Sequence, residues 1–401
     1  MTQHILTDAT VVMPDRTCEA AVVIEDDRIA EILPGRRFAD SFSLAGTLLV
    51  PGLVDIHTDY LEREARPPRN GVPRMNSVDF SLEMSFHFMD TRAIAAGVTT
   101  VLGSARISDS RESARWKYGD GLRLARSYPE LSLHALARHF VHVRWDPTFE
   151  PADEAVAQLE CIECIGNLVY NDATPGTRNQ NIEDQIQAYV FHRQVSVEQA
   201  RAHFAELIEK SRMVNNRAAI RDAFEGRIPI GSHDDSSADE VIEAHAYGAT
   251  LAEMPVTMDA ARQAKALDMM VCMGAPNYVW GRSHCGNLSS IAAMEMGLLD
   301  IFCSDFHFPA MLAAAVTMIK RGMSPSDVFR LLSLNPARHL RLDHEIGSIE
   351  VGRKADLVAF VPMKDFGRVT HVWVDGALCS EIANERPPRP PIQAISVHAT
   401  L

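Results

Sequence analysis

The sequence predicts an α/β fold, namely a (β/α)8 TIM-like barrel with a small β-domain beside it. Between residues 51 and 340, strand-like apolar runs recur eight times with helical patterns between them, as expected of parallel β-α repeats. Near both ends of the chain, alternating runs such as AAVVIEDDRIAEILPG and RVTHVWVDGAL indicate short strands. No glycine-rich nucleotide fingerprint follows a predicted strand, so an open doubly wound sheet is the weaker alternative.

The chain divides into four predicted segments. Residues 1–50 and 341–385 are the two parts of the β-domain, residues 51–340 are the barrel, and the proline-rich residues 386–401 are an extended arm. The barrel strands are expected within 52–59, 97–105, 131–146, 164–172, 227–235, 248–257, 269–277 and 298–307.

Composition narrows the classes of function. The 401 residues carry a net charge of −14, which argues against nucleic-acid binding but allows a local arginine cluster to bind an anionic small molecule. No apolar run reaches membrane-spanning length, and the mixed start MTQHILTDATVVMPD does not resemble a signal peptide. We therefore expect a cytoplasmic protein without a membrane or nucleic-acid partner, and we expect it to be a homo-oligomer.

Polar side chains follow six of the eight predicted strands. They are His57 and Asp59; His142, Arg144 and Asp146; Asn171 and Asp172; His233, Asp234 and Asp235; Glu253; and Asp305 and His307. In such a barrel the carboxyl ends of the strands meet at one mouth, where so many carboxylates would repel one another without a cation. Mixed histidine and carboxylate donors suit zinc, manganese or iron.

Several of these groups also have purely structural interpretations. Taken alone, His307 is more simply a structural histidine that forms hydrogen bonds. Asp234 and Asp235 directly precede Ser236, Ser237 and a helical pattern, so helix capping is favoured over metal binding for both. For His57 and Asp59 the alternative is a local Asx-type turn, which is disfavoured once the other strand ends are considered.

Several motifs resemble a known family. PGLVDIHTD and NPARHLRLDHEIGSIEVGRKADLVAF resemble the amidohydrolase superfamily. Four further stretches resemble its PhnM branch, the α-D-ribose 1-methylphosphonate 5-triphosphate diphosphatases. They are HTDYLE (57–62), SHDDSS…EAHAYGATLAEMPVT (232–257), MGAPNYVWGRSHCGN (273–287) and CSDFHFPAMLAAA (303–315). The resemblance extends over nearly the whole chain, and HTD in place of the usual His-x-His is a feature of this branch.

The resemblance implies a site with one or two divalent ions, for which zinc is favoured over manganese or iron. His57, Asp59, His233 and Asp305 are the implied ligands. Many relatives bridge two metals with a carbamylated lysine, but no lysine lies near the ends of strands 3 and 4. Asp146 is therefore our first choice for a bridging carboxylate, and Asp172 is the second. Glu253 stands where other branches carry a histidine, and it either binds the metal or orients a ligand.

The resemblance also implies a mechanism and a substrate. A divalent metal lowers the pKa of a water molecule, and Asp305 accepts a proton as that water attacks phosphorus or an acyl carbon. The residues expected to contact a triphosphate are His142, Arg144, Asp172, Arg178, Asn277, Arg282 and His284. A hydrolase that releases pyrophosphate in phosphonate catabolism is the first hypothesis. The alternatives are a C–N hydrolase or deaminase acting on another small anionic substrate, and a barrel that has lost catalysis.

Overall fold

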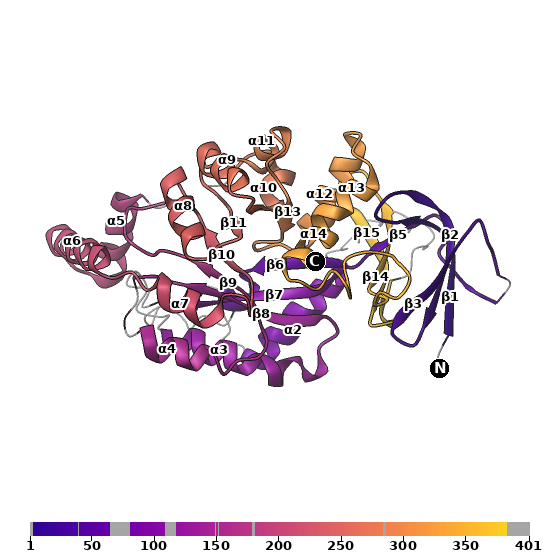
Figure 1. Cartoon of the computed structure of the whole chain (residues 1–401), viewed down its shortest axis with the longest axis horizontal. Helices are drawn as coiled ribbons and strands as arrows, with labels where there is room; N and C mark the ends of the chain where they lie inside the picture. The colour runs from indigo at the N-terminus through magenta and orange to yellow at the C-terminus, as the bar shows by residue number, and fades with distance from the viewer. Residues whose placement is uncertain are drawn as a thin grey trace, which may run out of the picture.

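The fold is described from a computed structural model (Figure 1). The structure describes residues 3–382 with the exception of 39, 65–80, 109–117, 149, 151, 179–180 and 284–285. His284 and the arm predicted for residues 386–401 therefore lie outside the described residues.

An eight-stranded parallel sheet forms the barrel, and all eight predicted barrel strands are confirmed. The strands are β6 (Leu53–Thr58), β7 (Val98–Ile107), β8 (Arg138–Trp145), β9 (Ile165–Tyr170), β10 (Ile230–His233), β11 (Leu251–Glu253), β12 (Met270–Gly274) and β13 (Ile301–Cys303). Each strand pairs with the next one in the chain, and a parallel bridge between Thr58 and Asp305 joins the first strand to the end of the last. The sheet therefore closes at the carboxyl end of β6.

Helices surround the sheet (Figure 1). They are α1 (Tyr60–Glu64), α2 (Leu82–Ala95), α3 (Tyr118–Leu131), α4 (Ala152–Leu159), α5 (Ile182–Arg193), α6 (Val197–Met213), α7 (Arg217–Phe224), α8 (Ala238–Ala246), α9 (Met258–Ala266), α10 (Ala275–Trp280), α11 (Ser290–Glu295), α12 (Pro309–Lys320), α13 (Pro325–Phe329) and α14 (Asn335–His339), with short η1 (Ser132–His134) and η2 (Arg330–Leu334). Hydroxyl side chains cap several of them; Ser196, for example, accepts from the Gln199 amide in a capping box. No helix among the described residues is long and apolar enough to cross a membrane.

A second sheet combines the two ends of the chain, as predicted. It contains β1 (Gln3–Val12), β2 (Thr17–Glu25), β3 (Arg28–Pro34), β4 (Phe42–Ser43), β5 (Leu48–Pro51), β14 (Leu357–Pro362), β15 (Gly367–Val374) and β16 (Ala377–Glu381). The N-terminal strand β5 pairs antiparallel with the C-terminal strand β14. Arg138 at the start of β8 donates to Asp356 and Asp375, both at 2.7 Å, and so ties this sheet to the barrel.

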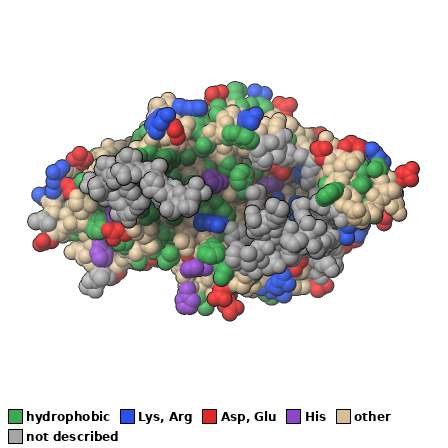
Figure 2. All heavy atoms as spheres, turned by 180° about the vertical axis from the view of Figure 1, so that it is seen from behind, with side chains coloured by type: hydrophobic (Ala, Val, Ile, Leu, Met, Phe, Trp, Pro, Cys, Tyr) green, Lys and Arg blue, Asp and Glu red, His purple; other side chains and the backbone are tan. Residues whose placement is uncertain are grey.

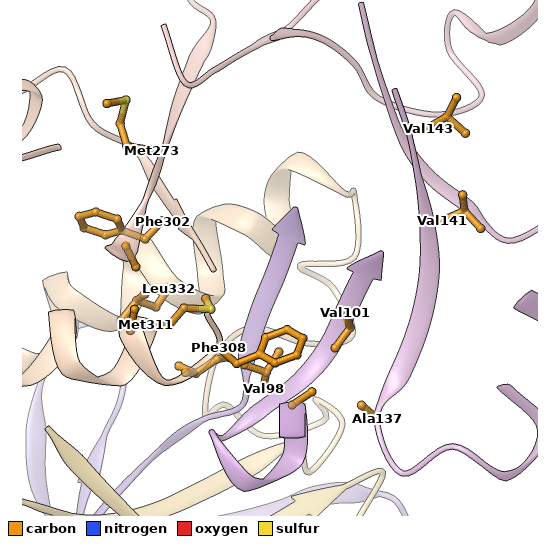
Figure 3. Close-up of a cluster of buried hydrophobic side chains, with 14 of the residues drawn as sticks. Val98, Val101, Ala137, Val141, Val143, Met273, Phe302, Phe308, Met311 and Leu332 are labelled. Carbon is orange, nitrogen blue, oxygen red and sulfur yellow. The ribbon is translucent and has the colours of Figure 1, made fainter. Parts of the chain in front are cut away.

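Alternation along the strands separates an outer core from the barrel interior. Val141 and Val143 point to the same side of β8, into the core that the strands share with the surrounding helices (Figure 3). A separate cluster contains residues from strands on opposite sides of the barrel, and such residues can meet only in the barrel interior. Its members are Val54, Ile56, Leu102, Leu251, Cys272, Ile301 and Cys303, with Ala337, Leu340 and Ile346 from the segment around and after α14. His142 and Glu253, which alternate with outer residues in the same way, therefore point into the barrel.

Charged side chains are dispersed over one face of the molecule. Figure 2 shows the face opposite to that of Figure 1, where acidic and basic side chains are interspersed and histidine side chains are visible near the middle.

Candidate active site

The seam where the barrel closes brings three predicted site residues together. The amide of Asp305 donates to the His57 carbonyl at 3.1 Å, and the amide of Asp59 donates to the Asp305 carbonyl at 2.7 Å. Two residues before His57 in β6, the buried Asp55 carboxylate accepts from the Ser304 amide at 2.9 Å, and burial raises the pKa of Asp55 to about 7. The same backbone pairing that closes the barrel thus places His57, Asp59 and Asp305 side by side.

Asp305 has an unusual backbone conformation and lies beside a glycine. Asp305 has a φ of 58°, in the left-handed region that aspartate tolerates better than most residues. Gly274, in the MGAPN motif, lies beside it, and a Cβ built on Gly274 would stand 3.5 Å from Asp305 Oδ2. A larger side chain at this glycine would fill the space next to the carboxylate.

Among the described residues, two groups of donors lie close enough to hold a metal ion. The outer cluster is His57, Asp59 and Asp305, and the inner cluster is His57, His233 and Glu253; within each, the ligand atoms lie within 4.8 Å of one another. His57 belongs to both, through different nitrogens. Its Nε2 lies 3.5 Å from Asp59 Oδ1, and its Nδ1 lies 3.0 Å from Glu253 Oε2.

A single carboxylate oxygen is the centre of the inner cluster. Glu253 Oε2 lies 2.7 Å from His233 Nδ1 and 3.3 Å from His142 Nε2, in addition to its contact with His57. The His57 and His233 rings are parallel, with their centroids 5.3 Å apart. All four side chains are buried, and Glu253 is 0% exposed.

The polar contacts continue through the barrel interior. His142 Nδ1 lies 3.1 Å from Asn167 Nδ2, and Asn167 Oδ1 lies 3.1 Å from Nε2 of His339 on α14. His142, Asn167 and His339 are all buried. The inner cluster is therefore connected to the helix that follows the barrel.

Burial and charge act in opposite directions on these groups. Burial opposes ionisation of Glu253, but the neighbouring His57 and His142 outweigh it and lower its pKa well below the usual value. Burial likewise opposes protonation of His57, yet Glu253 and Asp59 raise its pKa well above the usual value. For His142 burial dominates and lowers the pKa to about 4, so this ring is neutral at pH 7.

Arginines line the mouth beside the outer cluster. Arg144 Nη1 donates to Asp59 Oδ1 at 2.8 Å, and Arg106 donates to Asn171 Oδ1 at 3.0 Å. The buried Glu62 carboxylate accepts from the Arg106 amide at 2.7 Å and lies 3.9 Å from Arg144 Nη1. The carboxylates raise the pKa of Arg144 in spite of its burial, so it remains charged.

Arg178 is placed behind the inner cluster. Its Nη1 donates to the His233 carbonyl and to Asp235 Oδ1, the latter at 2.9 Å. Asp235 also accepts from the Ser232 hydroxyl, and the side chain that caps α8 is that of Ser237. The prediction that Asp235 caps this helix is therefore wrong: its carboxylate pairs with an arginine that lies 57 positions earlier in the sequence.

The remaining predicted residues lie outside both clusters. Asp146 Oδ1 accepts from the Thr148 amide and hydroxyl, and its Oδ2 accepts from Ser108 at 2.9 Å. Asp172 Oδ1 accepts from the Thr174 amide, and its Oδ2 lies 3.5 Å from Arg217.

Two predicted substrate contacts come from the segment around α10. Arg282 is exposed and stacks over the Trp280 ring with its guanidinium carbon 4.4 Å from the centroid. Asn277 is half-buried in the first turn of α10.

Sequence reasoning did not single out four residues of this region: Glu62, Arg106, Asn167 and His339. Two of them carried a recognisable signal. Asn167 is a polar residue inside the apolar run CIGNLVY, and Glu62 ends the HTDYLE motif. His339 lies beyond the barrel strands, where a test restricted to strand ends does not reach.

The outer cluster fits a four-coordinate divalent ion. Such an ion with ligands at about 2.0–2.2 Å separates its donor atoms by about 3.3–3.6 Å. The 3.5 Å between His57 Nε2 and Asp59 Oδ1 matches this spacing and is longer than a normal hydrogen bond. Imidazole and carboxylate donors are also those expected for zinc, manganese or iron.

The fold and this donor set define a barrel hydrolase with a candidate metal centre. The Amidohydrolase family matches residues 48–379, and the chain belongs to this family. Its members are hydrolases that typically bind divalent metals.

Relatives match over most of the chain. It is 28% identical over 390 residues to the alpha-D-ribose 1-methylphosphonate 5-triphosphate diphosphatase of Escherichia coli (strain K12), which covers 93% of this chain and 99% of that protein. It is 22% identical over 365 residues to the imidazolonepropionase of Fusobacterium nucleatum, covering 84% of each. The structure of N-acetylglucosamine-6-phosphate deacetylase from Pasteurella multocida superposes with a TM-score of 0.62 at 15% identity, covering 94% of this chain and 99% of that one. This likeness shows a shared fold.

Proposed function

We propose that the protein is a metal-dependent phosphoric anhydride hydrolase that releases pyrophosphate from a phosphorylated ribose compound in phosphonate catabolism. The observation that carries the proposal is the similarity to the diphosphatase of Escherichia coli, which extends over 99% of that protein. The arginines at the mouth add support, because guanidinium groups suit the bidentate binding of phosphate oxygens.

In this proposal the outer cluster holds the divalent ion, with His233 as a further ligand. A divalent ion there supplies Lewis acidity and lowers the pKa of a water molecule. Asp305 accepts the proton of the attacking water, since its carboxylate is held at the seam next to His57 and Asp59. Arg144 contacts Asp59 and is close enough to the outer cluster to bind a phosphate oxygen of the substrate.

Asp146 and Asp172 are less favourable bridging ligands than the sequence suggested. The carboxylate of Asp146 and that of Asp172 each accept hydrogen bonds from neighbouring donors, and neither residue belongs to the outer or the inner cluster. We therefore propose a site with one ion, in which Arg144 supplies the second positive charge near Asp59.

One observation favours the alternative of a C–N hydrolase. Arg144 and Arg178 already pair with Asp59 and Asp235, so much of their charge is neutralised before any substrate arrives. A pocket of this kind suits a less highly charged substrate than a triphosphate.

A substrate screen distinguishes the two functions. Purified protein loaded with zinc or manganese is incubated with ribose triphosphates, nucleotides and N-acyl compounds, and pyrophosphate and ammonia are both measured. The proposal predicts pyrophosphate release that the Asp305→Asn variant lacks. Release of ammonia or of a free carboxylate, without pyrophosphate from any triphosphate, would show that the alternative is right.

A further inference from the structure

We propose that Glu253 is a positioning residue: one of its carboxylate oxygens accepts hydrogen bonds from three histidines and so determines which nitrogen of each ring faces the metal site. This inference rests on the outer cluster being the metal site of the proposed function. It assigns a role to the carboxylate at the end of β11, the sixth strand of the barrel. The sequence left open whether this carboxylate binds the metal or orients a ligand.

The distances separate the two clusters by chemistry. Glu253 Oε2 lies 2.7 Å from His233 Nδ1 and 3.0 Å from His57 Nδ1, which are hydrogen-bond distances. They are shorter than the spacing of about 3.3–3.6 Å that a four-coordinate ion imposes on its donors. The distances from Glu253 to His57 and His233 are therefore those of hydrogen bonds, whereas the 3.5 Å between His57 Nε2 and Asp59 Oδ1 is the separation of two ligands of one ion.

When one ring nitrogen of His57 binds a metal, only the other nitrogen can carry a proton. If Nε2 faces an ion in the outer cluster, Nδ1 keeps its hydrogen and needs a buried acceptor. Two groups lie near His57 Nδ1, namely Glu253 Oε2 at 3.0 Å and His142 Nε2 at 3.2 Å. Because His142 Nε2 carries a proton of its own, Glu253 Oε2 is the acceptor. Metal-binding histidines commonly donate their second N–H to a carboxylate in this way, which fixes the ring and its tautomer. Metal ions in both clusters at once would require His57 to lose both ring protons.

The same oxygen sets the state of His233. Its Nδ1 points at Glu253 Oε2, so its Nε2 is directed away from the inner cluster. The His57 and His233 rings, which both face this oxygen, are parallel. A single residue thus orients two of the four implied metal ligands.

The hydrogen bonds continue from Glu253 in one direction. The Asn167 amide donates to His142 Nδ1 at 3.1 Å, so His142 carries its proton on Nε2. This Nε2 lies 3.3 Å from Glu253 Oε2 and 3.2 Å from His57 Nδ1. The Asn167 carbonyl oxygen is then the acceptor for His339 Nε2–H. All donors in the series therefore point toward Glu253, from α14 through the barrel interior to the metal site.

The opposite assignment places different nitrogens at the metal. If the inner cluster held the ion, Nδ1 of His57 and Nδ1 of His233 would be ligands, and both rings would carry their protons on Nε2. The nitrogen that couples to the metal therefore reports which cluster binds it. The tautomers of His142 and His339 report whether Glu253 accepts a proton from His142.

Histidine ¹⁵N NMR of the full-length protein measures these tautomers directly. In protein loaded with ¹¹³Cd, we expect scalar coupling of the metal to Nε2 of His57 and His233, with both Nδ1 atoms protonated. In metal-free and loaded protein alike, His142 and His339 are expected as Nε2–H tautomers. Coupling of ¹¹³Cd to Nδ1 of His57 or His233, or an Nδ1–H tautomer of His142, would overturn the proposal.

Substitution of Glu253 supplies a second test. Glu253→Gln is expected to weaken zinc binding by about 10–100-fold, the usual effect of removing such an orienting group, while ¹¹³Cd stays coupled to the same Nε2 atoms. The matched control is Asp90→Asn, because Asp90 Oδ1 accepts from the buried His139 at 2.8 Å, on the outer side of the barrel away from both clusters. Unchanged zinc affinity in Glu253→Gln would refute the positioning role.

The two proposals fail in different ways. If no pyrophosphate is released but the tautomers are as expected, the substrate assignment is wrong and the role of Glu253 stands. If the protein binds neither zinc nor ¹¹³Cd, the metal site is wrong. The tautomers of His142 and His339 in the metal-free protein then still decide whether Glu253 accepts from the histidines.

Discussion

Replacing Asp305 by asparagine tests the proposed mechanism with little disturbance of the fold. The seam contacts of Asp305 are made by its backbone: its amide donates to His57, and its carbonyl accepts from Asp59. Asparagine preserves both contacts and tolerates the φ of 58°, whereas a residue such as alanine would pay roughly 1–2 kcal/mol for a left-handed conformation. The barrel is therefore expected to remain closed in this variant.

The expected loss concerns proton transfer. A positioned general base typically contributes about 10²–10⁴-fold to the rate. At about 1.36 kcal/mol per tenfold change in rate, the Asp305→Asn variant should raise the activation free energy by about 2.7–5.5 kcal/mol. Because the substrate contacts remain, the change should appear in kcat far more than in KM.

The assay is steady-state release of pyrophosphate or of the alternative product by metal-loaded protein, with bound metal measured in parallel. The matched control is Asp26→Asn, since Asp26 has a φ of 53° and lies at the turn between β2 and β3, in the second sheet. The control should keep wild-type kcat. A kcat of Asp305→Asn within threefold of wild type, with metal still bound, would refute the role of Asp305 as proton acceptor.

Four further results are expected. Removal of divalent metal by a chelator should abolish activity, and readdition of zinc or manganese should restore it; activity that survives complete removal would contradict the metal assignment. Arg144→Met should raise KM for a phosphorylated substrate by about tenfold or more, because a hydrogen bond to a charged group is worth about 1.5–3 kcal/mol, and an unchanged KM would remove Arg144 from the substrate site. Gly121→Ala would place a Cβ 2.0 Å from the Arg106 carbonyl oxygen, so urea unfolding should show a loss of about 1–3 kcal/mol, whereas Gly119→Ala, with no atom within 4 Å, should cause none. The hydrogen bonds to Asp90 outweigh its burial and lower its pKa from 3.8 in the folded protein. Its contribution to stability is therefore present above about pH 4 and is lost as the pH falls through the lower pKa of the folded state. Urea unfolding of Asp90→Asn at different pH values should lack this acid-dependent part.

The barrel could be predicted from the sequence because its signal is local and repeated. Each strand is a short apolar run followed by a helical pattern, and eight such units restrict the topology strongly. The strand ends were predictable for the same reason: alternation alone places His142 and Arg144 on one face of β8. The pairing between the two ends of the chain could also be predicted, because strand patterns occur both before and after the barrel segment in the sequence.

The choice among carboxylates at the mouth was not predictable in this way. Glu253 is the last residue of β11 and projects inward to His57, as alternation places it. Asp146 lies just beyond the end of β8 and folds back onto Thr148, two residues further on. That contact depends on the turn after β8, which alternation does not describe. Asp235 was misassigned for a similar reason, since its partner Arg178 lies far away in the sequence.

Stability and function share the same contacts at the seam. The pairing of β6 with the end of β13 is needed to close the barrel, and it is also what holds His57, Asp59 and Asp305 within reach of one ion. Side-chain variants there can remove chemistry while the backbone keeps the barrel closed. Glu253 has the complementary position: it takes no part in the pairing of β6 with the segment after β13, and its carboxylate contacts three histidines from three other strands. Loss of that carboxylate should therefore change the orientation of the ligands, and with it the affinity for metal, before it changes the closure of the barrel.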